Sequence, residues 1–206
     1  EHFVETNNAL PINPKMTLRE YKMVDYRPFL LAMQGRNRIL TTRKARSDLL
    51  AVIDFSESDH FRRFFVFDLK AKKVLFNYWT SHGAGSDPNR TGYAELFSNE
   101  SETKKSSPGF SIANETYDGK WGYSLRLDGI DGDLNSRMRI RGIVMHGWGM
   151  SPANYVIPLT RDSQRTSNHG VRSEGCFMLS ASESGRFYGM EDEPYFKIVI
   201  DEIKGG

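Results

Sequence analysis

Short apolar stretches separated by polar turns dominate the chain from about residue 48 onward. Residues 49–55 and 63–69 have the length and the β-branched and aromatic content of strands, and 70–73 predicts a hairpin turn that returns through 74–79. Further strands are predicted at 109–114, 123–127, 140–145, 155–159 and 195–201, with a short helix at 180–188. The pattern therefore predicts a mainly β domain with some α structure.

The first part of the chain has a different period. After a lead-in at 1–15 that contains prolines and asparagines, Thr17 and Glu20 have the spacing of a helix capping box, and apolar residues then recur at helical intervals. We expect Pro28 to end or kink this helix and Gly35 to close its continuation. The apolar stripe is ordinary for a half-buried helix, which favours a helix packed on the rest of the protein over a separate binding module.

Glycine, asparagine and serine dominate residues 83–108, where only 93–97 is apolar. Loops of this length in a compact domain are usually functional or mobile. The change of period divides the chain into an N-terminal extension with a helix, 1–45, and a main domain, 46–206. With 206 residues the protein can bury a sizeable core.

The charge and composition of the chain limit the kinds of partner that we expect. The chain carries 28 basic and 26 acidic residues, so its net charge is +2 and nothing in it demands a nucleic acid. No apolar run is long enough to span a membrane, and no signal-peptide pattern stands at the start. The chain begins with Glu1 rather than methionine, which we interpret as a removed leader or a trimmed sequence. Secretion is therefore permitted.

Cys176 is the only cysteine, so it cannot form a disulfide within the chain. It is either a packed thiol or a nucleophile, and its context alone favours neither. For a nucleophile, the preceding Arg172, Ser173 and Glu174 form a polar loop whose cation is expected to lower the thiol pKa. Gly175 has no Cβ, so the amides of Gly175 and Cys176 can converge on a carbonyl oxygen as an oxyanion hole.

A nucleophilic thiol needs a base, and the chain offers five histidines: His2, His60, His82, His146 and His169. His146 ends a predicted strand beside Gly147, although a histidine at such a place can equally bond to the backbone. His169 lies in a polar turn seven residues before the thiol, where it can line the site or stand in solvent. Zinc binding by Cys176 is disfavoured because the chain has no CxxC or HxxxH spacing. We therefore expect no cofactor and no metal.

The ordered sequence blocks around these residues resemble one family. His146-Gly147 followed by Ser173-Glu174-Gly175-Cys176 is similar to the HG…SxGC signature of the L,D-transpeptidase catalytic domain, a YkuD-like fold of bacterial cell-wall enzymes. Other blocks agree in order with its murein L,D-transpeptidase branch: Phe65 to Leu69, Ser81 to Gly85, Tyr117 to Lys120, Gly122 to Gly129 and Arg141 to Gly147. The resemblance extends over residues 62–180, and the ordered set is far more specific than a lone SxGC.

The resemblance implies a YkuD-like mixed β-sandwich, with its site at one edge, as the catalytic domain at 46–206. It implies that Cys176 is the nucleophile, that His146 is the base, and that the backbone carbonyl of Gly147 orients the imidazole. Gly175 completes this set through its amide. The candidate substrate-binding residues are Arg172, Ser173, His169, His82 and Tyr123.

The implied activity is cysteine-dependent acyl transfer on peptidoglycan stem tetrapeptides. An amine of a neighbouring stem as acceptor gives a 3–3 cross-link, a D-amino acid exchanges the terminal residue, and water gives L,D-carboxypeptidase activity. A non-catalytic peptidoglycan-binding domain and an unrelated cysteine hydrolase are the other classes. The same resemblance implies acylation by carbapenem-type inhibitors and secretion across the inner membrane to the periplasm or cell wall.

Two features depart from the family pattern. Residues 151–168 lengthen the stretch between His146 and Cys176 and are expected to form a flap over the cleft. Phe177 and Met178 follow the cysteine, where the compact form of the family has an apolar residue and then asparagine or arginine. Both departures leave the nucleophile in place and concern the recognition of the acceptor.

Overall fold

The computed structural model describes residues 26–42, 48–59, 61–120, 122–147 and 172–179. Its elements are α3 (Arg27–Thr42), β1 (Leu49–Ile53), β2 (Phe64–Asp68), β3 (Lys73–Tyr78), β4 (His82–Gly83), η1 (Ala84–Ser86), β5 (Ser111–Gly119), β6 (Gly122–Gly129), η2 (Gly132–Leu134), β7 (Val144–Gly147), β8 (Arg172–Ser173) and β9 (Phe177–Leu179). The described part is mostly β, as the periodicity predicts.

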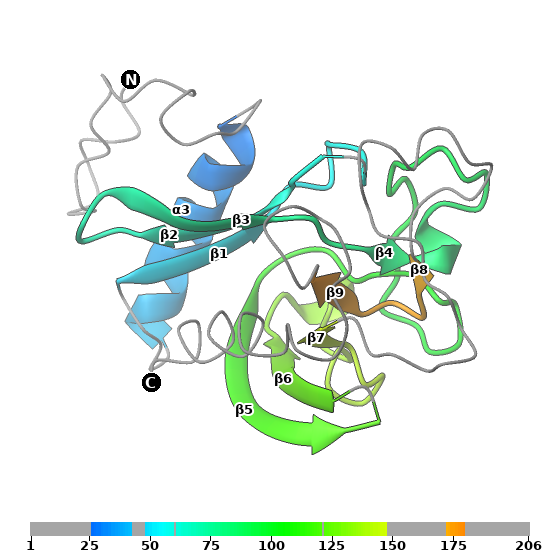
Figure 1. The fold of residues 1–206 in the computed structure, drawn as a ribbon. Helices are drawn as coiled ribbons and strands as arrows, with labels where there is room; N and C mark the ends of the chain where they lie inside the picture. Colours follow the sequence, from blue (N-terminus) through cyan, green and yellow to red (C-terminus); the bar gives the residue numbers. More distant parts are fainter. Residues whose placement is uncertain (1–25, 43–47, 60, 121, 148–171, 180–206) are drawn as a thin grey trace.

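The strands form two larger sheets and one short pair. β1, β2 and β3 make an antiparallel sheet, and β5, β6, β7 and β9 make a mixed sheet in which only the β7–β9 pairing is parallel. β4 and β8 pair in parallel beside them. Figure 1 shows α3 lying across the β1–β3 sheet, with the β5–β6 hairpin curving away below it.

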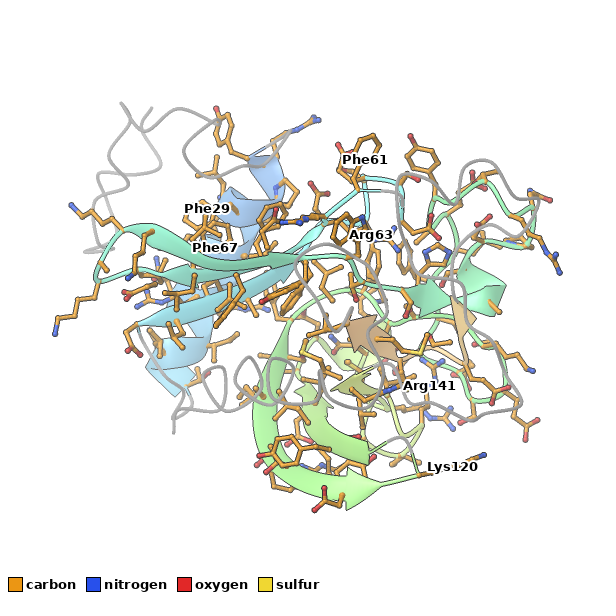
Figure 2. All side chains as sticks on the ribbon, viewed as in Figure 1. Phe29, Phe61, Arg63, Phe67, Lys120 and Arg141 are labelled. Atoms are coloured by element: carbon orange, nitrogen blue, oxygen red, sulfur yellow. The ribbon has the colours of Figure 1, made fainter. Side chains whose placement is uncertain are left out.

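β2 is buried on both faces, which explains its unbroken apolar run. Phe64 and Val66 enter a core cluster with residues of β6, β7 and β9, so this core lies between the two larger sheets. Phe65 and Phe67 point the other way and join a second cluster with Phe29 of α3. The rings of Phe29 and Phe67 lie 4.7 Å apart, centroid to centroid (Figure 2). α3 therefore packs on the β1–β3 sheet, while the earlier part of the predicted helix lies outside the described residues.

The prediction that Gly35 closes the helix is wrong, whereas the prediction that Pro28 ends or kinks a preceding helix concerns residues before 26, which the structure does not describe. Pro28 lies in the first turn of α3, where its missing N–H has no helical partner to lose. Gly35 is buried in the middle of α3. A Cβ at Gly35 would overlap the ring of Phe110, so glycine here permits the close approach of an aromatic side chain.

The predicted strands at 49–55, 63–69, 74–79 and 123–127 are confirmed within a few residues at their ends. The strand predicted at 109–114 begins at Ser111 and continues to Gly119. The strand predicted at 140–145 starts only at Val144, because Arg141 and Gly142 close turns onto preceding carbonyls and Gly142 has a positive φ of 67°.

Several predictions fall on residues that the structure does not describe: the capping box at Thr17, the flap at 151–168, the strands at 155–159 and 195–201, and the helix at 180–188. Within the described ranges, no helix has the length and apolar character needed to cross a membrane.

Candidate active site

The parallel pairing of β7 with β9 brings the two halves of the predicted site together. Met145 lies opposite Phe177, and His146 lies opposite Met178. Met145 and Phe177 both enter the core between the sheets, so His146 and Met178 point to the other face of the sheet.

Cys176 directly precedes β9 and is two residues from Met178, the partner of His146 in the β7–β9 pairing. A shift of two residues along the strand and one strand sideways corresponds to about 8 Å between Cα atoms. The fold therefore brings the segment of the thiol next to the strand of the imidazole.

The His146 ring has a defined tautomer. Nδ1 lies 2.6 Å from the carbonyl oxygen of Gly147. Because a carbonyl only accepts hydrogen bonds, Nδ1 carries the proton and Nε2 carries the lone pair that a base requires. Burial lowers the pKa of His146, and the bond to Gly147 opposes this effect only partly. The imidazole is thus neutral at neutral pH and able to accept a proton.

The thiol of Cys176 differs from the sequence-based expectation. Burial raises its pKa, with a further increase from the nearby Glu174 carboxylate, while the Val144 amide and the Arg141 guanidinium act in the opposite direction. The prediction of a lowered pKa is therefore wrong, because desolvation outweighs the cation. Sγ donates to the carbonyl oxygen of Gly142 at 3.4 Å. The thiol of Cys176 and the imidazole of His146 are thus both uncharged at neutral pH, so a thiolate would form there only with the help of a base.

This raised pKa predicts the pH dependence of alkylation. In a His146→Ala protein, where no imidazole assists, the rate at which iodoacetamide modifies Cys176 should increase with pH, with a midpoint above that of the same chain unfolded in urea, near the ordinary thiol value of about 8.5. The comparison is clean because the chain has no other cysteine. A rate already at its plateau in weakly acidic solution would instead indicate a preformed thiolate and contradict this description.

Ser173 and Gly175 shape the loop that presents the thiol. Ser173 Oγ donates to the carbonyl oxygen of Cys176 at 2.6 Å and accepts a bond of 3.1 Å from the Gly175 amide. The predicted oxyanion hole of two amides is thus altered, because the Gly175 amide folds back onto Ser173. Gly175 has a φ of 124°, a conformation that side chains with a Cβ rarely adopt.

Gly175→Ala should therefore damage the site. Its Cβ would lie 2.6 Å from Ile143 Cδ1 and 2.9 Å from the Lys105 carbonyl oxygen, in a strained backbone conformation. We expect a loss of activity of about 100-fold through displacement of the thiol, measured as turnover of peptide substrate. Gly132→Ala is the matched control, since Gly132 also has a positive φ but its Cβ would meet no atom within 4 Å. Equal activity of the two variants would contradict the proposed role of the loop.

Arg141 is the cation that sequence reasoning missed. Its guanidinium donates to the carbonyl oxygens of Ser98 and Lys105 at 2.6 and 2.7 Å, and its charge acts on the thiol of Cys176 (Figure 2). The long loop at 83–108 is thereby fastened to the turn before β7. The signal available in the sequence was an arginine directly before the Gly142 turn in a block that resembles the family.

The other candidates fall in different places. His82 is fully buried, and its backbone pairs with Arg172 in the β4–β8 ladder, while the Arg172 side chain is not described. Tyr123 packs against the core between the sheets, on the face opposite Ser124 and His146, so the structure does not bring it to the thiol. His169 lies outside the described residues.

Within the described ranges, no group of three histidine, cysteine or acidic residues is arranged to hold a metal ion. What the described residues present is a thiol, an imidazole with its lone pair on Nε2, and a nearby guanidinium. Such a set is suited to nucleophilic attack on a carbonyl followed by proton return to a leaving amine.

Comparison with known families agrees with this chemistry. The family model described as the L,D-transpeptidase catalytic domain (YkuD_2) matches residues 20–190. No curated protein and no solved structure matches the chain significantly. The matched range contains every described element, including both strands that carry the candidate thiol and histidine.

Proposed function

Because the chain belongs to the L,D-transpeptidase catalytic domain family, we propose that it transfers acyl groups of peptidoglycan stem tetrapeptides through a thioester on Cys176. The observation that carries this proposal is the β7–β9 pairing, which brings the segment of Cys176 next to the strand of His146, a histidine whose Nδ1 donates to the Gly147 carbonyl oxygen. An intact thiol and base argue against a non-catalytic peptidoglycan-binding domain.

The first step forms the acyl-enzyme. His146 Nε2 removes the proton of Cys176, and the thiolate attacks the carbonyl carbon of the third stem residue at its L-centre. The amide of Cys176 is the donor we assign to the resulting oxyanion, since the Gly175 amide is engaged by Ser173. The carbon–nitrogen bond then breaks, and His146 returns its proton to the departing D-amino acid.

The second step releases the acyl group. An amine attacks the thioester, loses a proton through His146, and frees the thiol. A side-chain amine of a neighbouring stem gives a 3–3 cross-link, a free D-amino acid exchanges the terminal residue, and water gives a tripeptide. Carbapenem-type inhibitors would acylate the same sulfur. This substrate implies a bacterial protein acting in the periplasm or cell wall after secretion.

Purified disaccharide-tetrapeptide muropeptides, incubated with the protein and analysed by mass spectrometry, test the proposed reaction. Dimers that have lost one D-alanine would establish transpeptidation, and tripeptide monomers would establish carboxypeptidase activity. Muropeptides that remain unchanged, with and without added D-amino acid, would overturn the proposed substrate.

A further inference from the structure

Arg63 is a charged side chain buried at the centre of the described fold. None of it is exposed, and it lies between the β1–β3 sheet and β4 (Figure 2). Nε and Nη2 both donate to the carbonyl oxygen of Thr80, at 3.2 and 3.0 Å. Nη1 donates to the carbonyl oxygen of Glu57 at 2.9 Å. A single guanidinium thus joins the chain before β2 to the segment that leads into β4.

The surrounding charges keep this arginine protonated. Burial lowers the pKa of Arg63 to about 10, against the attraction of Asp59, Asp54 and Asp87, so the group stays charged at neutral pH. Buried ionic clusters are seldom the most stabilising solution for a core, and an apolar replacement of similar volume is often as stable. Stability alone therefore does not account for a buried guanidinium held in one orientation by these hydrogen bonds.

His82 is held by the same guanidinium. Arg63 Nη2 lies 2.7 Å from His82 Nδ1, and because arginine only donates, Nδ1 accepts. The proton of the neutral ring is therefore on Nε2, which faces Asp87 Oδ2 at 3.6 Å. This tautomer is opposite to that of His146, and the His82 ring lies between Arg63 and Asp87 with one nitrogen facing each of them.

The segment fixed by Arg63 holds the strand of the nucleophile. Thr80 Oγ1 and the Ser81 amide both donate to the Met178 carbonyl oxygen at 3.0 Å. Ser81 Oγ accepts from the Met178 amide at 3.0 Å and donates to the Cys176 carbonyl oxygen at 3.4 Å. Residues 80 and 81 therefore bind both the N–H and the carbonyl oxygen of Met178 in β9 and reach the backbone of the nucleophile itself.

A second connection runs through the β4–β8 pair. His82 and Gly83 lie opposite Arg172 and Ser173, and Ser173 Oγ donates to the same carbonyl oxygen of Cys176. Ser106 Oγ, fully buried, accepts from the Gly83 amide and donates to the Gly175 carbonyl oxygen, each at 3.0 Å. Both connections start from the segment that Arg63 fixes. The first ends on the backbone of Met178 and Cys176, and the second ends on the backbone of Gly175 and Cys176.

We propose that Arg63 is a positioning residue that, by fixing residues 80–83, sets the orientation of the Cys176 thiol toward His146. The inference deepens the proposed function and rests on it. Arg63 touches neither the sulfur nor the substrate in this arrangement, and it acts through hydrogen bonds to the backbone on either side of the nucleophile.

Substitutions at Arg63 distinguish an effect on the orientation of the thiol from an effect on substrate binding. For Arg63→Met we expect kcat for muropeptide turnover to fall by up to about 100-fold while KM changes by less than about threefold. Arg63→Lys keeps the charge but offers one ammonium for three acceptors, so it should recover only part of this loss. Arg62→Met is the matched control, because Arg62 is adjacent and its guanidinium stacks on the Trp79 ring; its activity should change by less than about twofold.

Alkylation of Cys176 at neutral pH gives a readout that needs no substrate, so it distinguishes failure of this inference from failure of the proposed function. Positioning predicts that His146→Ala slows alkylation much less in the Arg63→Met background than in the wild-type protein. Two results in an Arg63→Met protein with a native circular dichroism spectrum would overturn the proposal. One is that the effects of Arg63→Met and His146→Ala on the alkylation rate are additive, and the other is a wild-type kcat. If Arg63→Met does not fold, Ser81→Ala removes the next contact in the same connection. Additive effects of Ser81→Ala and His146→Ala on the alkylation rate would then overturn the proposal as well.

Discussion

Replacing Cys176 by alanine should abolish turnover of tetrapeptide muropeptides, with a loss of at least about 10⁴-fold in kcat. The proposed reaction passes through a bond to Sγ, and the described site offers no second thiol, because the chain contains one cysteine. The substitution removes one atom from a half-buried position at the start of β9, so the fold should be retained.

The measurement is product formation by mass spectrometry, with the thermal unfolding midpoint of each protein as the control for folding. Cross-linked dimers or tripeptides produced at the wild-type rate by a folded Cys176→Ala protein would contradict a cysteine mechanism. Cys176→Ser is a useful companion variant, since it retains size and polarity but offers a far poorer nucleophile.

Replacing His146 by alanine should lower kcat/KM by about 10²- to 10⁴-fold, the usual contribution of a general base. The raised thiol pKa makes this dependence strong, because few thiolates form without help at neutral pH. His146 acts as a base only when neutral, and burial lowers its pKa. Wild-type activity should therefore persist to a pH below the ordinary histidine value of about 6.5 before it declines.

In His146→Ala the decline at the low histidine pKa should be replaced by a residual rate that rises with pH up to the raised thiol pKa, as the thiol ionises unaided. The pH profiles of kcat/KM for both proteins provide the measurement. His169→Ala tests whether His169 is the base instead. If that variant loses the decline of kcat/KM at low pH while His146→Ala retains it, the assignment of His146 is wrong.

The elements that the sequence predicts well are those whose burial follows from local pattern. The apolar content of 63–69 predicts a strand, and the structure confirms it and places the residues at 64–67 alternately in two core clusters. Likewise, His146-Gly147 predicts a strand end with a histidine, and the register of β7 and β9 places that histidine beside the cysteine strand.

The errors arise where distant residues decide the outcome. Gly35 would end an isolated helix, but the ring of Phe110 packs against its bare Cα and the helix continues. The polar loop predicts that the thiol pKa falls, yet desolvation of the thiol itself reverses the sign. No local pattern reports burial produced by contacts between segments far apart in sequence.

The contribution of Arg63 is hidden for the same reason. In sequence it is one of two adjacent arginines before a strand, and an arginine there is ordinarily a solvated surface residue. Only the folded chain brings it to the carbonyl oxygen of Thr80, 17 residues away, and through Ser81 to Cys176, a further 95 residues away.

The most direct test of the central claim is to locate the acyl group on the protein. A tetrapeptide muropeptide is mixed with the enzyme, the reaction is stopped in acid, and the digested protein is analysed by mass spectrometry. The account predicts an adduct of the disaccharide-tripeptide acyl group, formed as D-alanine is released, on the peptide that contains Cys176. Product formation with no acyl adduct on that peptide, or with the adduct on another residue, would contradict it.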